Sequence, residues 1–141
     1  MLNKDEIQGI ADEVVKELKS DFEEKVYQEA FLAELRFRQY EYDRERVIPV
    51  LYRDQQIEFV KADVVVRQDS KEVVLELKIG GDDDVKEKIR NELKAYLRAI
   101  QKSQPPSAGI ERKGFVVVFP CTSAKKNAKP PTRATVDEVS V

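Results

Sequence analysis

Two short stretches decide how this sequence folds: KADVVV at residues 61–66 and VVLELK at residues 73–78. Both are rich in β-branched and apolar residues, which favour β-strands, and the polar segment 67–72 between them is typical of a turn. A hairpin that closes symmetrically over this turn pairs Val66 with Val73. We therefore predict two antiparallel strands in this register.

The same register places Asp63 directly opposite Glu76. Side chains two positions apart on a strand leave the same face, so Lys78 joins the two carboxylates there. The opposite face of the hairpin is expected to be wholly apolar, with Ala62, Val64, Val66, Val73, Leu75 and Leu77.

Two facing carboxylates repel each other, and this costs stability unless a positive charge compensates. Lys78 can compensate in part, and a hard divalent cation such as Mg²⁺ would do so better. Such a cation would polarise a phosphate and lower the pKa of a bound water, which the lysine would position. The alternative interpretation is a solvated strand face that carries an ordinary cross-strand ion pair.

The 141 residues are enough for one domain with a core of its own. Charged residues make up 37% and hydrophobic residues 41%, which favours a folded, soluble chain, and no apolar run approaches the roughly 20 residues of a membrane helix. Histidine is absent, which excludes histidine-dependent hydrolases and histidine-ligated zinc. The single Cys121 excludes an internal disulfide and favours an intracellular, reducing compartment, cytoplasmic or nuclear.

Around the hairpin, hydrophobic spacing predicts the order α-α-β-β-β-α-β, an α/β domain with a mixed sheet flanked by helices. Helices are expected at 7–18, 22–37 and 85–100, and strands at 47–52, 57–66, 73–79 and 114–120. The last strand follows a helical crossover, so it should lie parallel to a partner. We place the domain at residues 1–120 and treat 121–141 as a basic, weakly patterned C-terminal tail.

The second helix should be capped at its start by Ser20 or Asp21. Its apolar side chains form a wide stripe that we expect to pack against the sheet. The centre of the stripe is Phe22, Val26, Ala30, Ala33 and Phe37, and Tyr27, Phe31 and Leu35 widen it.

The run DFEEKVYQEA at residues 21–30 resembles the signature of the GxxExxY protein family, which belongs to the PD-(D/E)xK nuclease superfamily. Residues 61–66 resemble the aspartate strand of this family, residues 73–78 its Glu-x-Lys strand, and residues 93–97 its following helix. The resemblance covers roughly residues 5–120. It implies a restriction-endonuclease-like fold and a metal-dependent nuclease, with DNA favoured as substrate.

Carried over to this chain, the resemblance implies that Asp63 and Glu76 bind Mg²⁺ (or Mn²⁺) and that Lys78 is the catalytic lysine. It also makes Glu24 a catalytic carboxylate that reaches the metal from a helix. Tyr27 lies one turn further along that helix, where it either joins the site or packs in the core with its hydroxyl bonded to Glu24 or a strand.

Two positions depart from the family pattern. Asp21 stands where the family has glycine, and Glu92 stands where it has glutamine. An additional carboxylate near the site could strengthen cation binding, but it would repel a phosphate. The alternative is therefore a catalytically inactive module of the same fold that binds nucleic acid or a protein partner, or a subunit that docks through its first helix.

Acidic side chains predominate in residues 1–84 and basic ones in residues 85–135. The best candidate surface for nucleic acid is the third helix, with Lys86, Arg90, Lys94 and Arg98. The two halves could instead neutralise each other across a shared surface. The small size also suggests a homodimer, because cleavage of two strands needs two sites.

Overall fold

The computed structural model describes residues 2–19, 22–80, 83–103, 109–120 and 133–141. The helices are α1 (Lys4–Leu18), α2 (Glu24–Phe37) and α3 (Asp83–Ser103), and the strands are β1 (Glu41–Tyr52), β2 (Gln55–Gln68), β3 (Lys71–Ile79), β4 (Glu111–Phe119) and β5 (Thr135–Val139). None of the helices in these ranges is both long and apolar enough to cross a membrane.

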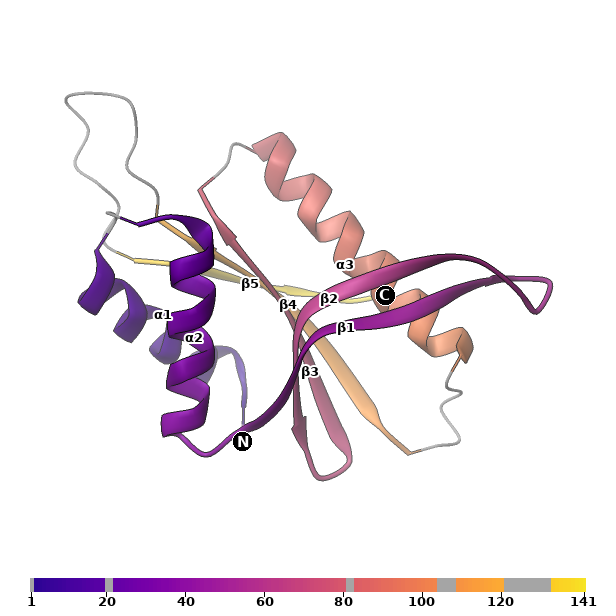
Figure 1. Cartoon of the computed structure of the whole chain (residues 1–141), viewed down its shortest axis with the longest axis horizontal. Helices are drawn as coiled ribbons and strands as arrows, with labels where there is room; N and C mark the ends of the chain where they lie inside the picture. The colour runs from indigo at the N-terminus through magenta and orange to yellow at the C-terminus, as the bar shows by residue number, and fades with distance from the viewer. Residues whose placement is uncertain (1, 20–21, 81–82, 104–108, 121–132) are drawn as a thin grey trace.

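The strands form a mixed sheet in the order β1-β2-β3-β4-β5. Neighbouring strands are antiparallel except β3 and β4, which run parallel and are joined through α3. Helices α1 and α2 lie on one side of the sheet and α3 on the other (Figure 1). This arrangement confirms the predicted α/β class, the predicted order of elements as far as β4, and the parallel pairing of β4 after the helical crossover.

The sequence indicated a weakly patterned tail after residue 120, but residues 135–139 of that segment form a strand. Strand β5 pairs antiparallel with β4, for example Val117 with Val136, and closes that edge of the sheet. The pattern was missed because the strand has only five residues and includes Asp137 and Glu138. The rest of the expected tail, Cys121 included, lies outside the described residues.

Each face of the sheet has its own hydrophobic core. Beneath α1 and α2, Phe31 and Leu35 pack with Leu75 and Phe115. On the other face, the buried residues of α3 pack on the sheet: Ile89, Leu93, Tyr96, Leu97 and Ile100 on the helix meet Val65, Val74 and Val116. The domain is thus a three-layer sandwich in which β3 and β4 are covered on both sides.

Helix α2 buries a different face from the one predicted. Tyr27, Phe31, Leu32 and Leu35 are its buried residues. Phe22 and Val26 are 48% and 38% exposed, and Phe37 is 81% exposed. Its N-cap is Glu23, which makes no side-chain capping bond, rather than Ser20 or Asp21, and those two lie outside the described residues.

Along β1 and β2, the series of alternate side chains that packs in one core switches to the other face of the sheet at Glu45 and Asp63. Tyr42 and Val64 pack beneath α1 and α2, whereas Ile48 and Ala62 lie in the core beneath α3. Glu45 has a positive φ of 52°, and the register is the same on both sides of it. Ala62 therefore lies on the face opposite to the one predicted, and the two strands continue beyond the sheet as a long ribbon (Figure 1).

Candidate active site

The predicted meeting of Asp63 and Glu76 occurs where β2 and β3 part. The two strands pair in the expected register, Val66 with Val73, as far as Val64 and Leu75. Beyond that pair the carboxylates take over the hydrogen bonding. The backbone N–H of Leu77 donates to Asp63 Oδ2 (2.9 Å), and the backbone N–H of Asp63 donates to Glu76 Oε1 (3.2 Å).

These two bonds fix both carboxylates in one place. Each is held by the backbone of the opposite strand, so their positions follow from the strands rather than from flexible side-chain rotamers. The reason is that the β2–β3 ladder stops at Val64 and Leu75, which frees backbone groups of Asp63 and Leu77 that a continuous ladder would have used. The point at which β2 and β3 separate, beyond Val64 and Leu75, is termed the strand fork, and it creates a paired-carboxylate site.

Glu76 is almost completely buried, with 4% of its surface exposed. Burial raises the pKa of Glu76 to about 8, the charge of Asp63 adds to this increase, and Lys78 opposes it. The charged form of Glu76 therefore costs stability in the absence of a divalent cation. A divalent cation held by Asp63 and Glu76 would relieve that cost.

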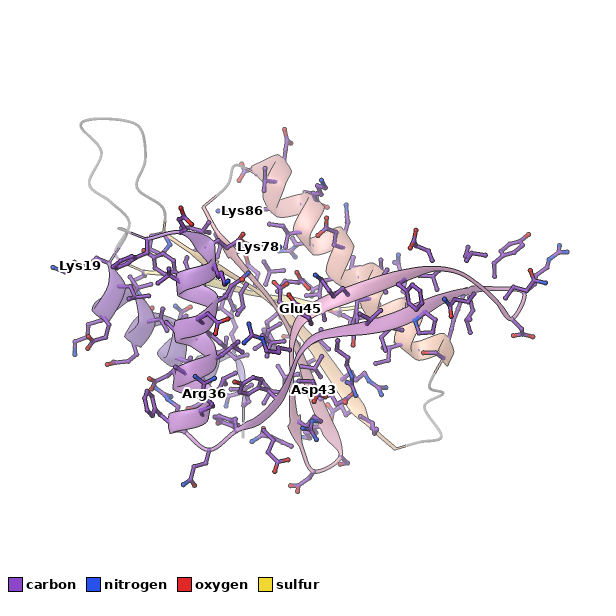
Figure 2. The ribbon with its side chains drawn as sticks, in the orientation of Figure 1. Lys19, Arg36, Asp43, Glu45, Lys78 and Lys86 are labelled. Atoms are coloured by element: carbon purple, nitrogen blue, oxygen red, sulfur yellow. The ribbon has the colours of Figure 1, made fainter. Side chains whose placement is uncertain are left out.

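Lys78 places a positive charge beside this pair. Its Nζ lies 4.0 Å from Glu76 Oε2, and about a quarter of its side chain is exposed. Burial alone would lower the pKa of Lys78, but four carboxylates raise it: Asp63, Glu76, Glu24 and Glu92. Lys78 is thus held charged where α2 and α3 approach the sheet (Figure 2).

Glu24 and Glu92 act on Lys78 electrostatically from the two helices, but only Glu92 lines the pocket beside Asp63 and Glu76. Glu24 is the first residue of α2, and Glu92 lies on the side of α3 that faces β2 and β3. A pocket of about 380 Å³ opens here; its lining is Val60, Lys61, Asp63, Glu76, Lys78, Glu92 and Ala95. Within the described residues, no three carboxylates or cysteines are close enough together to hold a metal ion by themselves.

Gln28 is a site residue that the sequence did not indicate. Its Nε2 donates to the carbonyl of Leu77 (2.8 Å), between Glu76 and Lys78 on β3. Gln28 is one turn from Glu24 on α2, so this bond fixes the helix face that carries Glu24 against the Glu-x-Lys strand. The only signal was this spacing, and it is common on any helix.

Tyr27 packs in the core and does not line the pocket. It is fully buried, and its ring stacks on Phe119 with centroids 5.3 Å apart. Its hydroxyl donates to the backbone carbonyl of Lys19 (2.5 Å), not to Glu24 or a strand as predicted. Tyr27 therefore connects the end of α1 to α2 and to the sheet.

Three of the four predicted nucleic-acid residues line a separate groove on the other side of α3. Lys86, Arg90 and Lys94 border this groove of about 450 Å³ together with Asp83, Glu87, Val116, Val118 and Asp137. Val116 and Val118 are the β4 partners of Glu76 and Lys78, so the groove lies beside the carboxylate site, one strand further along the sheet. Arg98 is exposed and does not belong to the groove lining.

A mixed sheet between helices, with a carboxylate pair and a lysine at a strand fork, is consistent with a restriction-endonuclease-like α/β domain. A family model described as the PD-(D/E)XK nuclease superfamily matches residues 2–126, and the chain belongs to that superfamily. Its members generally use divalent metal ions. The match does not distinguish the GxxExxY family within it, and comparisons with the curated proteins and with the solved structures give no match.

Proposed function

We propose that this protein is a metal-dependent nuclease that hydrolyses phosphodiester bonds in nucleic acid, with DNA favoured. The observation that carries the proposal is the pair of hydrogen bonds that join Asp63 and Glu76 across the strand fork, with Lys78 beside them. A buried carboxylate pair of this kind costs stability unless a positive charge compensates it, so its occurrence on paired strands supports a cation.

In this proposal each side chain of the site has one role. Asp63 and Glu76 would hold Mg²⁺ or Mn²⁺, and Glu24 would contribute the negative charge of a further carboxylate from α2. Bound there, the ion supplies electrostatic stabilisation of the charge that develops on the phosphate. Lys78 donates to the attacking water or to a phosphate oxygen, and it remains protonated because carboxylates surround it.

Glu92 and Gln28 have supporting roles. Glu92 is exposed beside Lys78 and reinforces the negative potential that attracts a cation. Gln28 is a positioning residue, because it touches the backbone of Leu77 rather than the reacting groups. Loss of Gln28 is expected to weaken activity less than loss of Asp63 or Lys78.

The test is a cleavage assay with Mn²⁺ or Mg²⁺ on a panel of single- and double-stranded DNA and RNA. We expect metal-dependent cleavage by the wild type and a loss of at least about 100-fold in Asp63→Asn and Lys78→Ala. Asp69→Asn is the matched control, because Asp69 is an exposed carboxylate in the turn at the other end of the hairpin. Activity that survives both site substitutions would refute the assignment.

A second candidate function is binding of nucleic acid without cleavage, and the groove beside α3 favours it. Lys86, Arg90 and Lys94 gather there, one turn apart, outside the carboxylate pocket. Fluorescence anisotropy against salt concentration measures the binding, and the cleavage assay on the same nucleic acids distinguishes the two functions. If the groove binds phosphates, each lysine or arginine replaced by alanine should reduce the salt slope by about 1, whether or not the chain cleaves.

A further inference from the structure

Helix α2 carries an apolar line that is exposed at both ends, while Ala30 and Ala33 in its middle are half-buried and Ala30 also packs against the core beneath α1 and α2. Val26, Ala30, Ala33 and Phe37 follow one another at intervals of four, three and four residues, and Phe22 precedes them by one turn. Phe37 is 81% exposed, Phe22 48% and Val26 38%. The spacing is the repeat by which two helices pack along a shared seam.

We propose that this face of α2 pairs with the same face of a second copy of the chain, with the two helices antiparallel. A two-fold axis between Ala30 and Ala33 places Ala30 against Ala33 of the partner subunit, where two small side chains allow close approach. The same axis places Val26 against the partner's Phe37. The large ring then fills the space beside a smaller side chain at both ends of the seam.

The charges beside the seam fit the antiparallel direction. Glu29 and Arg36 lie on one flank of it, two turns apart; Arg36 is exposed and Glu29 is half-buried. In the antiparallel pair Glu29 faces Arg36 of the partner subunit, twice by symmetry. A parallel pair would instead bring Glu29 beside Glu34 of the partner subunit, and like charges at these positions are repulsive.

Both charged side chains are already held in place within the chain. Glu29 forms an ion pair with Arg44 on β1, and Arg36, labelled in Figure 2, donates to the hydroxyl of Tyr42 (2.5 Å). Their ordering therefore costs little when the second copy binds. Because α2 is only about 21 Å long, the seam is smaller than a standard interface, and we expect a dissociation constant on the order of 10 µM.

Disulfide trapping tests the direction of the pair. In a Cys121→Ser background, proteins carrying Val26→Cys and Phe37→Cys are prepared separately, mixed and oxidised. The antiparallel seam predicts a heterodimer crosslink in the mixture and at least about tenfold less crosslinking of either protein alone, because equal positions lie far apart. Crosslinking of Val26→Cys to itself, or none in the mixture, would overturn the arrangement.

Sedimentation velocity from about 1 to 200 µM tests the dimer itself. Phe37→Glu should raise the dissociation constant at least tenfold, and the fold should survive because Phe37 is mostly exposed. Glu29→Arg and Arg36→Glu should each weaken the dimer, and the double variant should restore it. Ile57→Glu on the β1–β2 ribbon is the control away from the seam, because Ile57 is 62% exposed, and it should change nothing.

A wild type that remains monomeric over the whole range would overturn the proposal. A dimer that is insensitive to Phe37→Glu would place the interface elsewhere and would also overturn it. Circular dichroism of every variant separates loss of pairing from loss of fold. None of these readouts involves cleavage, so the dimer stands or falls independently of the nuclease activity.

Discussion

Glu76 is buried and lies beside Asp63, and both conditions disfavour its charged form. Register arithmetic on the two strands predicted this meeting, because both strands are strongly β-branched and the turn between them is polar. The arithmetic could not predict that the ladder stops there, or that backbone N–H groups hold the carboxylates. Those features depend on the switch of faces at Glu45 and Asp63, for which the sequence has no local signal.

Glu76→Gln should stabilise the metal-free protein at neutral pH. The pKa of Glu76 lies above its ordinary 4.5 when the chain is folded, so the folded state binds this proton more tightly. Stability from the protonated form is present at low pH and is lost as the pH rises from about 4.5 to about 8. Glutamine does not titrate, so the variant avoids that loss.

Urea unfolding in EDTA at several pH values measures the effect. The variant should exceed the wild type in free energy of unfolding by about 1 to 3 kcal/mol at pH 8 and by little at pH 4.5. The wild type should lose this deficit when Mn²⁺ is added. A difference that does not grow with pH would contradict the account of Glu76.

Glu72 shows the opposite case, a buried carboxylate with good partners. Arg46 NH1 donates to it (2.6 Å), and Arg112 Nε donates from the other side (2.8 Å). Burial alone would raise the pKa of Glu72, but the two guanidinium groups lower it overall. The stability that results is present above about pH 4.5 and is lost as the pH falls through the lower, folded pKa.

Glu72→Gln should therefore destabilise the protein by about 2 to 4 kcal/mol at pH 7, because it leaves two arginines facing an uncharged group. The difference between variant and wild type should shrink in acid, where both side chains are neutral. Thermal unfolding from pH 7 to pH 3 measures it. An equal difference at both ends of the range would show that the ion pairs do not contribute.

Among the elements, α2 shows what hydrophobic periodicity can predict about a helix and what it cannot. The helix has apolar side chains on two faces, and both satisfy a helical repeat. Periodicity predicted the helix but could not choose which face meets the sheet, since that choice depends on the packing of Tyr27 on Phe119. The short strand β5 was missed for the opposite reason, because it is too brief to show a repeat.

The packing of α3 on β4 depends on Gly114. A Cβ at this position would lie 2.9 Å from Leu97 Cδ1 and 3.3 Å from Leu93 Cγ, and both leucines are buried. Gly114→Ala should cost about 1 to 3 kcal/mol of unfolding free energy, because the helix must shift or the leucines must repack. Chemical denaturation measures this cost.

Gly9→Ala is a suitable control for that prediction. Its Cβ would have only Arg38 NH1 within reach, at 4.0 Å, and alanine is favoured in a helix. We expect Gly9→Ala to be neutral or slightly stabilising. If Gly114→Ala were equally harmless, the close approach of α3 to β4 would not be a constraint on this fold.

At the scale of the whole molecule, four elements converge on one site. β2 and β3 supply Asp63, Glu76 and Lys78, while α2 and α3 bring Glu24 and Glu92 to the same lysine. The α/β order and the central three residues followed from the sequence. The separation of the carboxylate pocket from the groove beside α3 did not, because the helical spacing of Lys86, Arg90 and Lys94 does not say which flank of α3 meets which strand.

Calorimetric titration with Mn²⁺ tests the central claim most directly, with wild type, Asp63→Asn and Asp69→Asn compared at pH 7.5. The account predicts saturable binding to the wild type and to Asp69→Asn, and at least about tenfold weaker binding to Asp63→Asn, because one of two ligand carboxylates is lost. Binding of equal strength in all three proteins, or no binding to the wild type, would contradict a cation site at the fork of β2 and β3.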